Sequence, residues 1–371
     1  MKVLFVADTK ITDYSGWSGT NHSQYIELIR RGHQVHCLED LIKRTPLFDL
    51  ASLSIHKRLG LLWMHNFSPV RSLLTAPLIR KTAKEFQPDV LFTTSPQLFA
   101  YVKRDIRQVA NLDVDPLTFA TAFGAVLPSW TVKAVKLCYN AAMRNLDVMA
   151  YPTEYAVRKH AENFLVPPRL TLRVSPYGLN MGLPEFDERW LAIRWSDVPR
   201  KLLFVATRWA PKGGPIAVET VRILRERHGL NVELHIAGLD TLPEPLPDFC
   251  VSHGFLSKSN PATLARLQDL YRSAFAFLLP TRFDAAGIVL AEAAAYGLPL
   301  MSVASGGTDY AVKTGRNGNL LPLDARPHDF AERLLEPWND EDLYRRLSLA
   351  SRAIAESLTW DNFFDRLDCG L

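Results

Sequence analysis

Two carboxylates stand among small and apolar residues between positions 280 and 299. Asp284 directly precedes a predicted helix, and Glu292 lies about two turns into it. The residues that open this helix are Ala285, Ala286, Gly287 and Ile288. Unpaired N–H groups at a helix start can bind a phosphate or a sugar hydroxyl. Glu292 can accept hydrogen bonds from two vicinal hydroxyls, such as those of a ribose. In a plainer interpretation Asp284 is a helix cap and Glu292 a solvated charge, but almost every neighbour of Glu292 is apolar.

Two further loops follow apolar runs that predict buried strands. After 202–206 come Arg208 and Lys212, and two cations at a strand end suit a diphosphate, although both could simply be solvated. After 300–304 come Ser305, Gly306 and Gly307, where a backbone can approach a ligand closely. Taken alone, this last loop is more often an ordinary glycine turn.

No metal site is predicted. Asp113 and Asp115 imitate a metal-binding Asp-x-Asp motif, but they precede Pro116, and turn-forming aspartates explain them. The four cysteines, Cys37, Cys138, Cys250 and Cys369, have neither metal-ligand nor disulfide-framework spacing.

The elements that must position these residues alternate between strands and helices. Residues 2–7, a small-residue loop over 15–20, a helix and a strand at 34–38 form a βαβ unit, which predicts a parallel sheet. Further strands are predicted at 89–94, 117–121, 147–151 and 170–174, and the alternation restarts after Lys201. The 371 residues therefore predict two α/β domains, 1–180 and 200–352, with a linker over 179–200.

These motifs resemble the retaining glycosyltransferases of the GT-B type, specifically glycosyltransferase family 4 (group 1). Residues 292–299 match the family's Glu-Ala-x-Ala-x-Gly-x-Pro pattern, and Asp284 takes the position of its first glutamate. Arg208 and Lys212 fall on its diphosphate-binding pair, and residues 305–307 on its donor-loop glycines. Two departures stand out. Asp284 is one methylene shorter than glutamate, and Phe123 stands where many relatives carry a histidine.

The resemblance implies two Rossmann-like, doubly wound domains that face each other across a cleft, and a C-terminal helix over 353–371 that returns towards the first domain. It further implies retaining, metal-independent transfer of a sugar from a nucleotide-diphosphate sugar, with no separate cofactor and with Asp284, Arg208 and Lys212 as catalytic residues. The acceptor would be a glycan, a lipid-linked glycan or a small-molecule glycoside. It is expected on the first domain beside Gly16, Ser18, Gly19, Thr20, His22, Thr94 and Ser95. His22 and His65 are each more often surface or packing residues than substrate contacts.

Two other functions fit the same pattern. A nucleotide-sugar epimerase of the GT-B fold would turn over the donor without an acceptor. A catalytically degenerate sugar-nucleotide-binding protein would bind the donor without transferring or epimerising its sugar. The departures at Asp284 and Phe123 keep this alternative open.

The positive charge is concentrated in one stretch. The chain has 43 Lys and Arg against 39 Asp and Glu, an excess too small to predict nucleic-acid binding. Residues 54–84 contain no acidic residue and six basic ones, which are Lys57, Arg58, Arg71, Arg80, Lys81 and Lys84. Basic residues interleaved with aromatic ones are typical of a surface that rests on anionic lipid. A solvated helix pair or a groove for an acidic acceptor would look similar. We therefore expect a cytoplasmic protein, with peripheral contact to the inner membrane face as an option.

Overall fold

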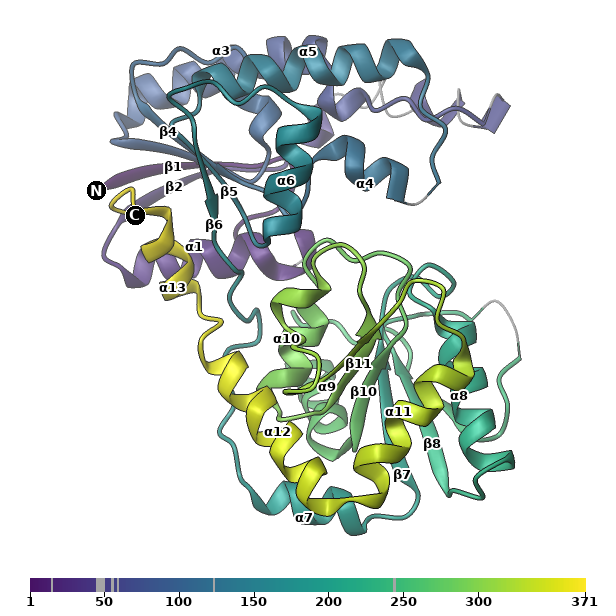
Figure 1. The fold of residues 1–371 in the computed structure, drawn as a ribbon. Helices are drawn as coiled ribbons and strands as arrows, with labels where there is room; N and C mark the ends of the chain where they lie inside the picture. Colours follow the sequence, from purple (N-terminus) through teal and green to yellow (C-terminus); the bar gives the residue numbers. More distant parts are fainter. Residues whose placement is uncertain (15, 45–50, 55–56, 59, 123, 243–244) are drawn as a thin grey trace. The chain divides into compact units, whose positions relative to one another are not determined.

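The computed structural model describes the chain except for residues 15, 45–50, 55–56, 59, 123 and 243–244. The chain divides into two compact units (Figure 1). The first unit comprises Met1–Asn180 and Trp360–Leu371, and the second comprises Met181–Thr359.

The first unit contains a six-stranded parallel sheet in the order β2-β1-β3-β4-β5-β6. Its strands are β1 (Lys2–Val6), β2 (Gln34–Leu38), β3 (Val90–Thr93), β4 (Arg107–Asn111), β5 (Val148–Tyr151) and β6 (Thr171–Val174). Its helices are α1 (Thr20–Arg30), α3 (Pro69–Phe86), α4 (Pro116–Ala122), α5 (Ser129–Asn145), α6 (Glu154–Asn163) and α13 (Trp360–Leu367). Helices α3 and α5 pack side by side over one face of the sheet, and α1 and α13 pack together on the other (Figure 1).

The second unit repeats this architecture with a parallel sheet in the order β12-β11-β10-β7-β8-β9. Its strands are β7 (Arg200–Val205), β8 (Val232–Ala237), β9 (Cys250–Ser252), β10 (Ala276–Leu279), β11 (Leu300–Val303) and β12 (Gly318–Leu321). Its helices are α7 (Arg189–Ser196), α8 (Gly214–Glu226), α9 (Pro261–Ser273), α10 (Ile288–Ala295), α11 (Pro327–Asn339) and α12 (Glu341–Glu356).

Each sheet has a point at which the strand order reverses, between β1 and β3 in the first unit and between β7 and β10 in the second. The loops that leave these paired strands at their carboxyl ends diverge to opposite sides of the sheet. Ligands of open α/β sheets bind in the crevice that this divergence opens. The topology therefore directs the search to the loops after β1, β3, β7 and β10.

The strand predicted at 117–121 is wrong, because these residues lie in helix α4. Asp115 caps this helix, since its carboxylate accepts hydrogen bonds from the N–H groups of Leu117 and Thr118 at 3.1 and 3.0 Å. The strand of this region is instead β4. Its buried Gln108 and Asn111 interrupt the apolar pattern, and their hydrogen bonds to Lys103 and Gln24 make that burial acceptable.

The segment predicted as a linker belongs mostly to the second unit. The chain divides after Asn180, and α7 packs on the second unit through the buried Leu191 and Arg194. The returning segment begins at Trp360 rather than at 353, because α12 continues to Glu356. Among the helices in the described part of the chain, none is long and apolar enough to cross a membrane.

Candidate functional site

Lys212 and Asp284 form an ion pair beside the reversal point of the second sheet. The Lys212 Nζ atom lies 2.7 Å from Asp284 Oδ2 and donates a second hydrogen bond to the Phe283 carbonyl at 3.2 Å. Only 17% and 15% of the two side chains are exposed. The other carboxylate oxygen of Asp284 accepts the Gly287 N–H at 2.8 Å. Asp284 therefore holds both the lysine ammonium and the start of α10 in place.

Glycines let the surrounding loops pack backbone against backbone. Gly213 has a φ of +82°, and a Cβ atom there would lie 2.0 Å from the Pro280 carbonyl oxygen. Gly306 has a φ of +66°, and its Cβ atom would lie 2.1 Å from the Asp284 carbonyl oxygen. Any other side chain would force the loops after β7, β10 and β11 apart. The close approach that these glycines permit is therefore, in this structure, an approach to neighbouring protein backbone.

The predicted donor-loop residues lie in the loops that follow β10 and β11. Gly287 is the N-cap of α10, and Ala285 and Ala286 are buried in the loop before it. The Ser305 hydroxyl donates to the Arg282 carbonyl at 2.7 Å, and the Gly307 N–H donates to the Asp284 carbonyl at 2.8 Å. The N–H groups of the first turn of α10 point away from the helix body, where an anion can accept from them.

Glu292 is buried, with 1% of its surface exposed, and is therefore not a solvated helix charge. Its Oε1 atom forms an ion pair with Lys258 Nζ, and its Oε2 atom accepts the Tyr271 hydroxyl at 3.4 Å. Burial, and then the Glu292 charge, raise the pKa of Tyr271 well above its usual value. The ring of Tyr271 stacks on Tyr296 with centroids 5.4 Å apart. Glu292 thus has a fixed position on α10.

Lys258 is a site residue that the sequence analysis missed. It lies between β9 and α9, 34 positions before Glu292, in a loop without a glycine motif or a second charge of its own. The only signal was its place after a strand, at the same sheet edge as the other loops. Arg208 lies on the exposed part of the loop after β7, ahead of the half-buried Lys212.

The predicted acceptor residues of the first unit come together at the carboxyl ends of β1 and β3. Asn180 ties down the loop before α1, because its Nδ2 atom donates to the Ser18 carbonyl and the Thr20 hydroxyl, both at 3.1 Å. Thr94 and Ser95 are buried after β3, and the Ser95 hydroxyl accepts the Asp8 N–H at 3.2 Å. Gly16 and Gly19 are buried in the same loop as Ser18. Ser15 and Phe123 lie outside the described residues.

The two histidines of this region have packing contacts. His22 is half-buried with its ring 4.5 Å from that of Tyr14, and its Nδ1 atom lies 3.3 Å from the Ile11 carbonyl oxygen. His65 is buried with its ring 5.7 Å from that of Trp63. Both therefore help to pack the helical segments on which they lie.

A buried ion pair between Asp8 and Arg71 was also missed. Arg71 on α3 is 1% exposed, and both of its terminal nitrogens bond to the Asp8 carboxylate at the end of β1. Gln97 donates to the same carboxylate at 2.8 Å. Asp8 and Arg71 are distant in sequence, so no local pattern indicates their pairing.

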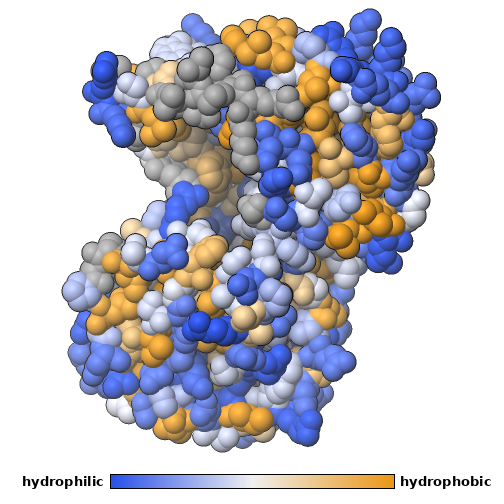
Figure 2. Space-filling view, turned by 180° about the vertical axis from the view of Figure 1, so that it is seen from behind, coloured by the Kyte–Doolittle hydropathy of each residue, from blue (hydrophilic) through white to orange (hydrophobic). Residues whose placement is uncertain are grey.

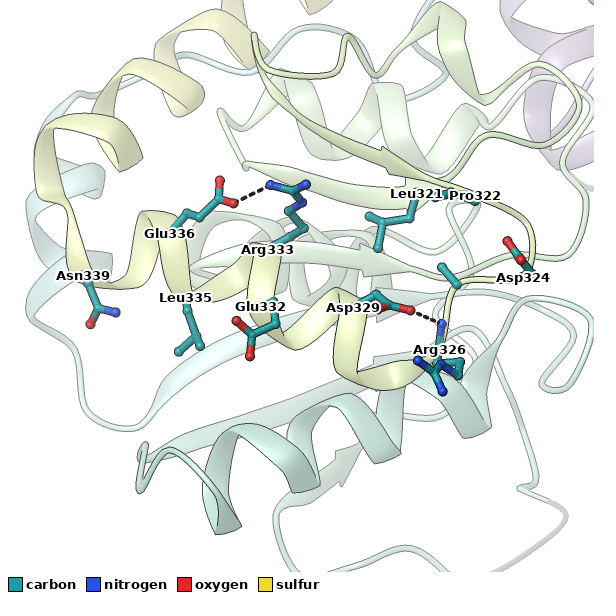
Figure 3. Close-up of a pocket in the computed structure, with 11 residues that line it drawn as sticks. Leu321, Pro322, Asp324, Arg326, Asp329, Glu332, Arg333, Leu335, Glu336 and Asn339 are labelled. Atoms are coloured by element: carbon teal, nitrogen blue, oxygen red, sulfur yellow. Dashed lines mark hydrogen bonds and ion pairs between the residues drawn. The ribbon is translucent and has the colours of Figure 1, made fainter.

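The described residues contain no group of three or more His, Cys, Asp or Glu side chains that could hold a metal ion. The structure does have a hollow of about 1040 Å³ beside β12 and α11 (Figure 3). Its charged side chains engage each other, as in the 2.6 Å contact between Arg333 and Glu336, and the Asp329 carboxylate accepts the Arg326 N–H at 2.7 Å. None of the predicted site residues is among those that line it. This hollow is thus separate from the candidate site.

Known proteins match this chain in sequence and in fold. Residues 199–340 match the family model described as glycosyl transferases group 1. An uncharacterised glycosyltransferase of Methanocaldococcus jannaschii is 29% identical over 195 residues, which cover 50% of this chain and 48% of that relative. A D-inositol 3-phosphate glycosyltransferase of Streptomyces bingchenggensis is 35% identical over 101 residues, covering 27% and 22% respectively. The matches therefore span about half or less of these curated relatives.

Solved structures match nearly the whole chain at low sequence identity. Sucrose-phosphate synthase of Thermosynechococcus elongatus has a TM-score of 0.70 and 14% identity, covering 98% of this chain and 96% of that one. WaaG, a glycosyltransferase involved in lipopolysaccharide biosynthesis, has a TM-score of 0.66 and 16% identity, covering 98% of each chain. HepE of Anabaena, in complex with UDP-glucose, has a TM-score of 0.65 and 14% identity, covering 99% and 98%.

The two parallel six-stranded sheets and these structural matches define a protein of the GT-B fold, as predicted from the sequence. The family model and the sequence relatives go one step further. Over residues 199–340, within its second unit, the chain is similar to the group 1 glycosyltransferases.

Proposed function

We propose that this chain is a retaining glycosyltransferase that moves a sugar from a nucleotide-diphosphate sugar to an acceptor hydroxyl. The observation that carries the proposal is the pairing of Lys212 with Asp284 and of Lys258 with Glu292 around a single helix, α10, beside the strand reversal point. Lysines, buried carboxylates and helix N–H groups together match a ligand that carries phosphates at one end and hydroxyls at the other.

Cleavage of the bond between sugar and diphosphate builds negative charge on the leaving diphosphate. Lys212, Arg208 and the first turn of α10 supply positive charge at this sheet edge, and groups that are already oriented stabilise a transition state without reorganising. Asp284 fixes the Lys212 ammonium through its 2.7 Å contact. We therefore assign Asp284 a positioning role towards Lys212 in addition to the sugar-hydroxyl contact that the family resemblance implies.

Glu292 would bind the two ribose hydroxyls of the donor nucleotide, with Lys258 holding its carboxylate in orientation. Retention of anomeric configuration and independence from metal are carried over from the family. The UDP-glucose bound to HepE supports testing uridine nucleotides first. The acceptor would bind the first unit beside Ser18, Thr20 and Ser95.

Transfer assays with Glu292→Ala and Lys212→Ala test this proposal. Each variant should lower transfer at least about tenfold, because each loses more than about 1.4 kcal/mol of charge-assisted contact. Arg333→Ala serves as the control, since Arg333 pairs with Glu336 on α11 and lines the separate hollow of the same unit. Near-normal transfer by both folded variants would contradict the site. Epimerisation of the donor without acceptor, or donor binding with no turnover, would favour one of the two alternative functions.

A second proposal concerns the outer face of α3 and α5, which we infer rests on anionic lipid. Its exposed apolar side chains include Leu73 and Leu74 on α3, 52% and 60% exposed, and Leu137 on α5, 60% exposed. The basic residues Arg80, Lys81, Lys84, Lys133 and Lys136 are exposed on the same two helices. Hydrophobic and strongly hydrophilic residues lie next to each other at the top of the first unit (Figure 2). Arg71, one of the six cations counted in 54–84, is not available to lipid because it pairs with Asp8.

Vesicle flotation tests this surface. The protein should float with phosphatidylglycerol-containing vesicles at low salt and be released by high salt, because the basic residues contribute about 1 kcal/mol each near an anionic surface. The double variant Leu73→Ser, Leu74→Ser should reduce flotation at least about fivefold through lost apolar insertion. Ile193→Ser, at a 61% exposed position of the second unit, should leave it unchanged. Absence of flotation of the unmodified protein at low salt would end the proposal.

A further inference from the structure

Four arginines line a hollow of about 420 Å³ near the amino ends of β4, β5 and β6. We call this hollow the arginine pocket, and its arginines are Arg104, Arg107, Arg169 and Arg173. The strands here have four or five residues, so roughly 13–17 Å separate their amino ends from their carboxyl ends. The predicted acceptor residues follow the carboxyl ends of β1 and β3. The arginine pocket therefore lies at the opposite ends of the strands from the predicted acceptor residues, and it has no role in the functions proposed above.

Asp147 holds two of the arginines by hydrogen bonds, but its single negative charge cannot neutralise both guanidinium groups. Its Oδ1 atom accepts from Arg104 at 2.8 Å and from Arg169 at 2.9 Å, while its Oδ2 atom accepts the Gln108 N–H at 2.9 Å. One carboxylate thus faces two guanidinium groups. Each guanidinium carries five N–H donors in a planar fork, so most of these donors are still available to a further acceptor.

Arg173 has a weaker internal partner. It donates to Asp368 at 3.1 Å, but 79% of the Asp368 side chain is exposed to solvent. An ion pair with so exposed a carboxylate contributes little and can be exchanged for another anion. The Arg173 Nε atom is buried and, within the part of the chain that the structure describes, has no hydrogen-bond partner. A buried guanidinium N–H without an acceptor points to a ligand that supplies one.

We propose that the arginine pocket binds a phosphate group. Four guanidinium groups face three carboxylates, Asp105, Asp147 and Asp368, so the lining has an excess of positive charge. Phosphate offers several acceptor oxygens in the geometry that guanidinium forks bind with two parallel hydrogen bonds. The volume is that of a small-molecule site. The ligand takes the place of Asp368 at Arg173, and it is either a free phosphate compound or the headgroup of a lipid.

Calorimetric titration with inorganic pyrophosphate tests the proposal. The full chain would carry Arg208→Ala and Lys212→Ala, so that the proposed donor site does not contribute, and ionic strength would be held constant with sodium chloride. We expect one saturable site. Adding Arg173→Ala should weaken binding at least about tenfold, and Asp368→Asn should tighten it about threefold, because the internal competitor is removed. Arg144→Ala, an exposed arginine on α5 of the same unit, is the matched control.

Two outcomes would overturn the proposal. One is the absence of saturable binding at matched ionic strength, and the other is an equal loss in Arg173→Ala and Arg144→Ala. Thermal unfolding without phosphate checks the fold of each variant, and Arg107→Ala replaces Arg173→Ala if the latter is unfolded. Phosphatidylglycerol vesicles separate the two sources of phosphate. Retention on vesicles that depends on Arg173 identifies a lipid headgroup, and pyrophosphate binding without such retention identifies a free phosphate compound.

Discussion

Lys258 is the charged group on which the buried Glu292 depends. A carboxylate with 1% exposure is stable only with a partner, and the Lys258 ammonium is that partner. The same ammonium orients the carboxylate for the ribose hydroxyls in the proposed donor complex. We therefore expect Lys258 to be a positioning residue with both a structural and a functional effect, and the two effects can be measured separately.

We predict that Lys258→Met raises the donor KM at least about tenfold and changes kcat less, because ground-state orientation of Glu292 is lost. It should also lower the stability of the second unit by about 3 kcal/mol, since a buried charge is left alone. Lys258→Arg should restore most of the donor affinity and most of the stability. Combining Lys258→Met with Glu292→Gln should restore stability but not donor affinity. An unchanged donor KM in Lys258→Met would contradict the positioning role.

At this scale the sequence indicated candidate site residues but not the contacts between them. Arg208, Lys212 and Asp284 became candidates because they follow buried strands, and Glu292 because almost all of its sequence neighbours are apolar. Their pairing was not found, because Lys212 and Asp284 are 72 positions apart and the contact depends on how two glycine loops pack. Lys258 carried no motif at all.

At the scale of the elements, α7 lies in the segment that the sequence predicts as a linker, but it packs as part of the second unit. Arg194 is 1% exposed and donates to the carbonyls of Arg272 at 2.7 Å and Tyr296 at 2.9 Å. These carbonyls belong to the last turn of α9 and the end of α10. One guanidinium thus bonds to the ends of two helices, and at α10 it adds to the left-handed Gly297 that follows the helix.

We predict that Arg194→Met lowers the free energy of unfolding of the second unit by about 2–3 kcal/mol, because buried carbonyls lose a charged donor. Chemical denaturation followed by a probe in the second unit measures this. Ile193→Ala, the exposed neighbour on the same helix, should change stability by less than about 0.5 kcal/mol. Equal stability of both variants would mean that α7 is a tether and not a structural element.

A second element-scale prediction concerns the contact between α6 and β5, where the Tyr151 hydroxyl and His160 Nδ1 lie 2.8 Å apart. Burial lowers the pKa of His160 from 6.5 to about 4. The folded state therefore excludes the proton that the unfolded chain binds, so the contribution is complete above pH 6.5 and is lost as the pH falls towards 4. Between pH 7 and 5 the first unit should lose about 2 kcal/mol.

Hydrogen exchange of the amides in α6 and β5, corrected for intrinsic rates, measures this loss. His160→Gln keeps an acceptor for the Tyr151 hydroxyl and cannot be protonated, so most of the pH dependence should disappear in this variant. A pH dependence that persists unchanged in His160→Gln would assign the effect to other groups.

The elements themselves were predictable where burial leaves a simple pattern. Strands buried on both faces, such as β1, β3 and β11, are short apolar runs in the sequence and were predicted. Strand β4 was not, because the polar Gln108 and Asn111 are buried in it, and the partner of Asn111, Gln24, lies far away in the sequence. The apolar run at 117–121 was misread because a side-chain cap, rather than periodicity, decides that it is helical.

At the scale of the whole molecule, two units of one architecture each present a strand reversal point with functional candidates on the loops that leave it. The alternation of strands and helices predicted this duplication. The arginine pocket was not predictable, because its arginines gather only when three strands align at their amino ends. For the surface that we propose rests on lipid, composition indicated residues 54–84 but not the exposed basic and apolar residues of α5.

The most direct test of the central claim is nucleotide binding by the intact chain. Thermal unfolding would be recorded with UDP, GDP, ADP and TDP, for the unmodified protein and for Lys212→Ala. One diphosphate should stabilise the second unit by about 2.7 kcal/mol at one hundred times its dissociation constant, and this stabilisation should be largely lost in Lys212→Ala. If no nucleotide stabilises the protein, or if the variant is stabilised equally, the second unit does not bind its donor through the loops after β7 and β10.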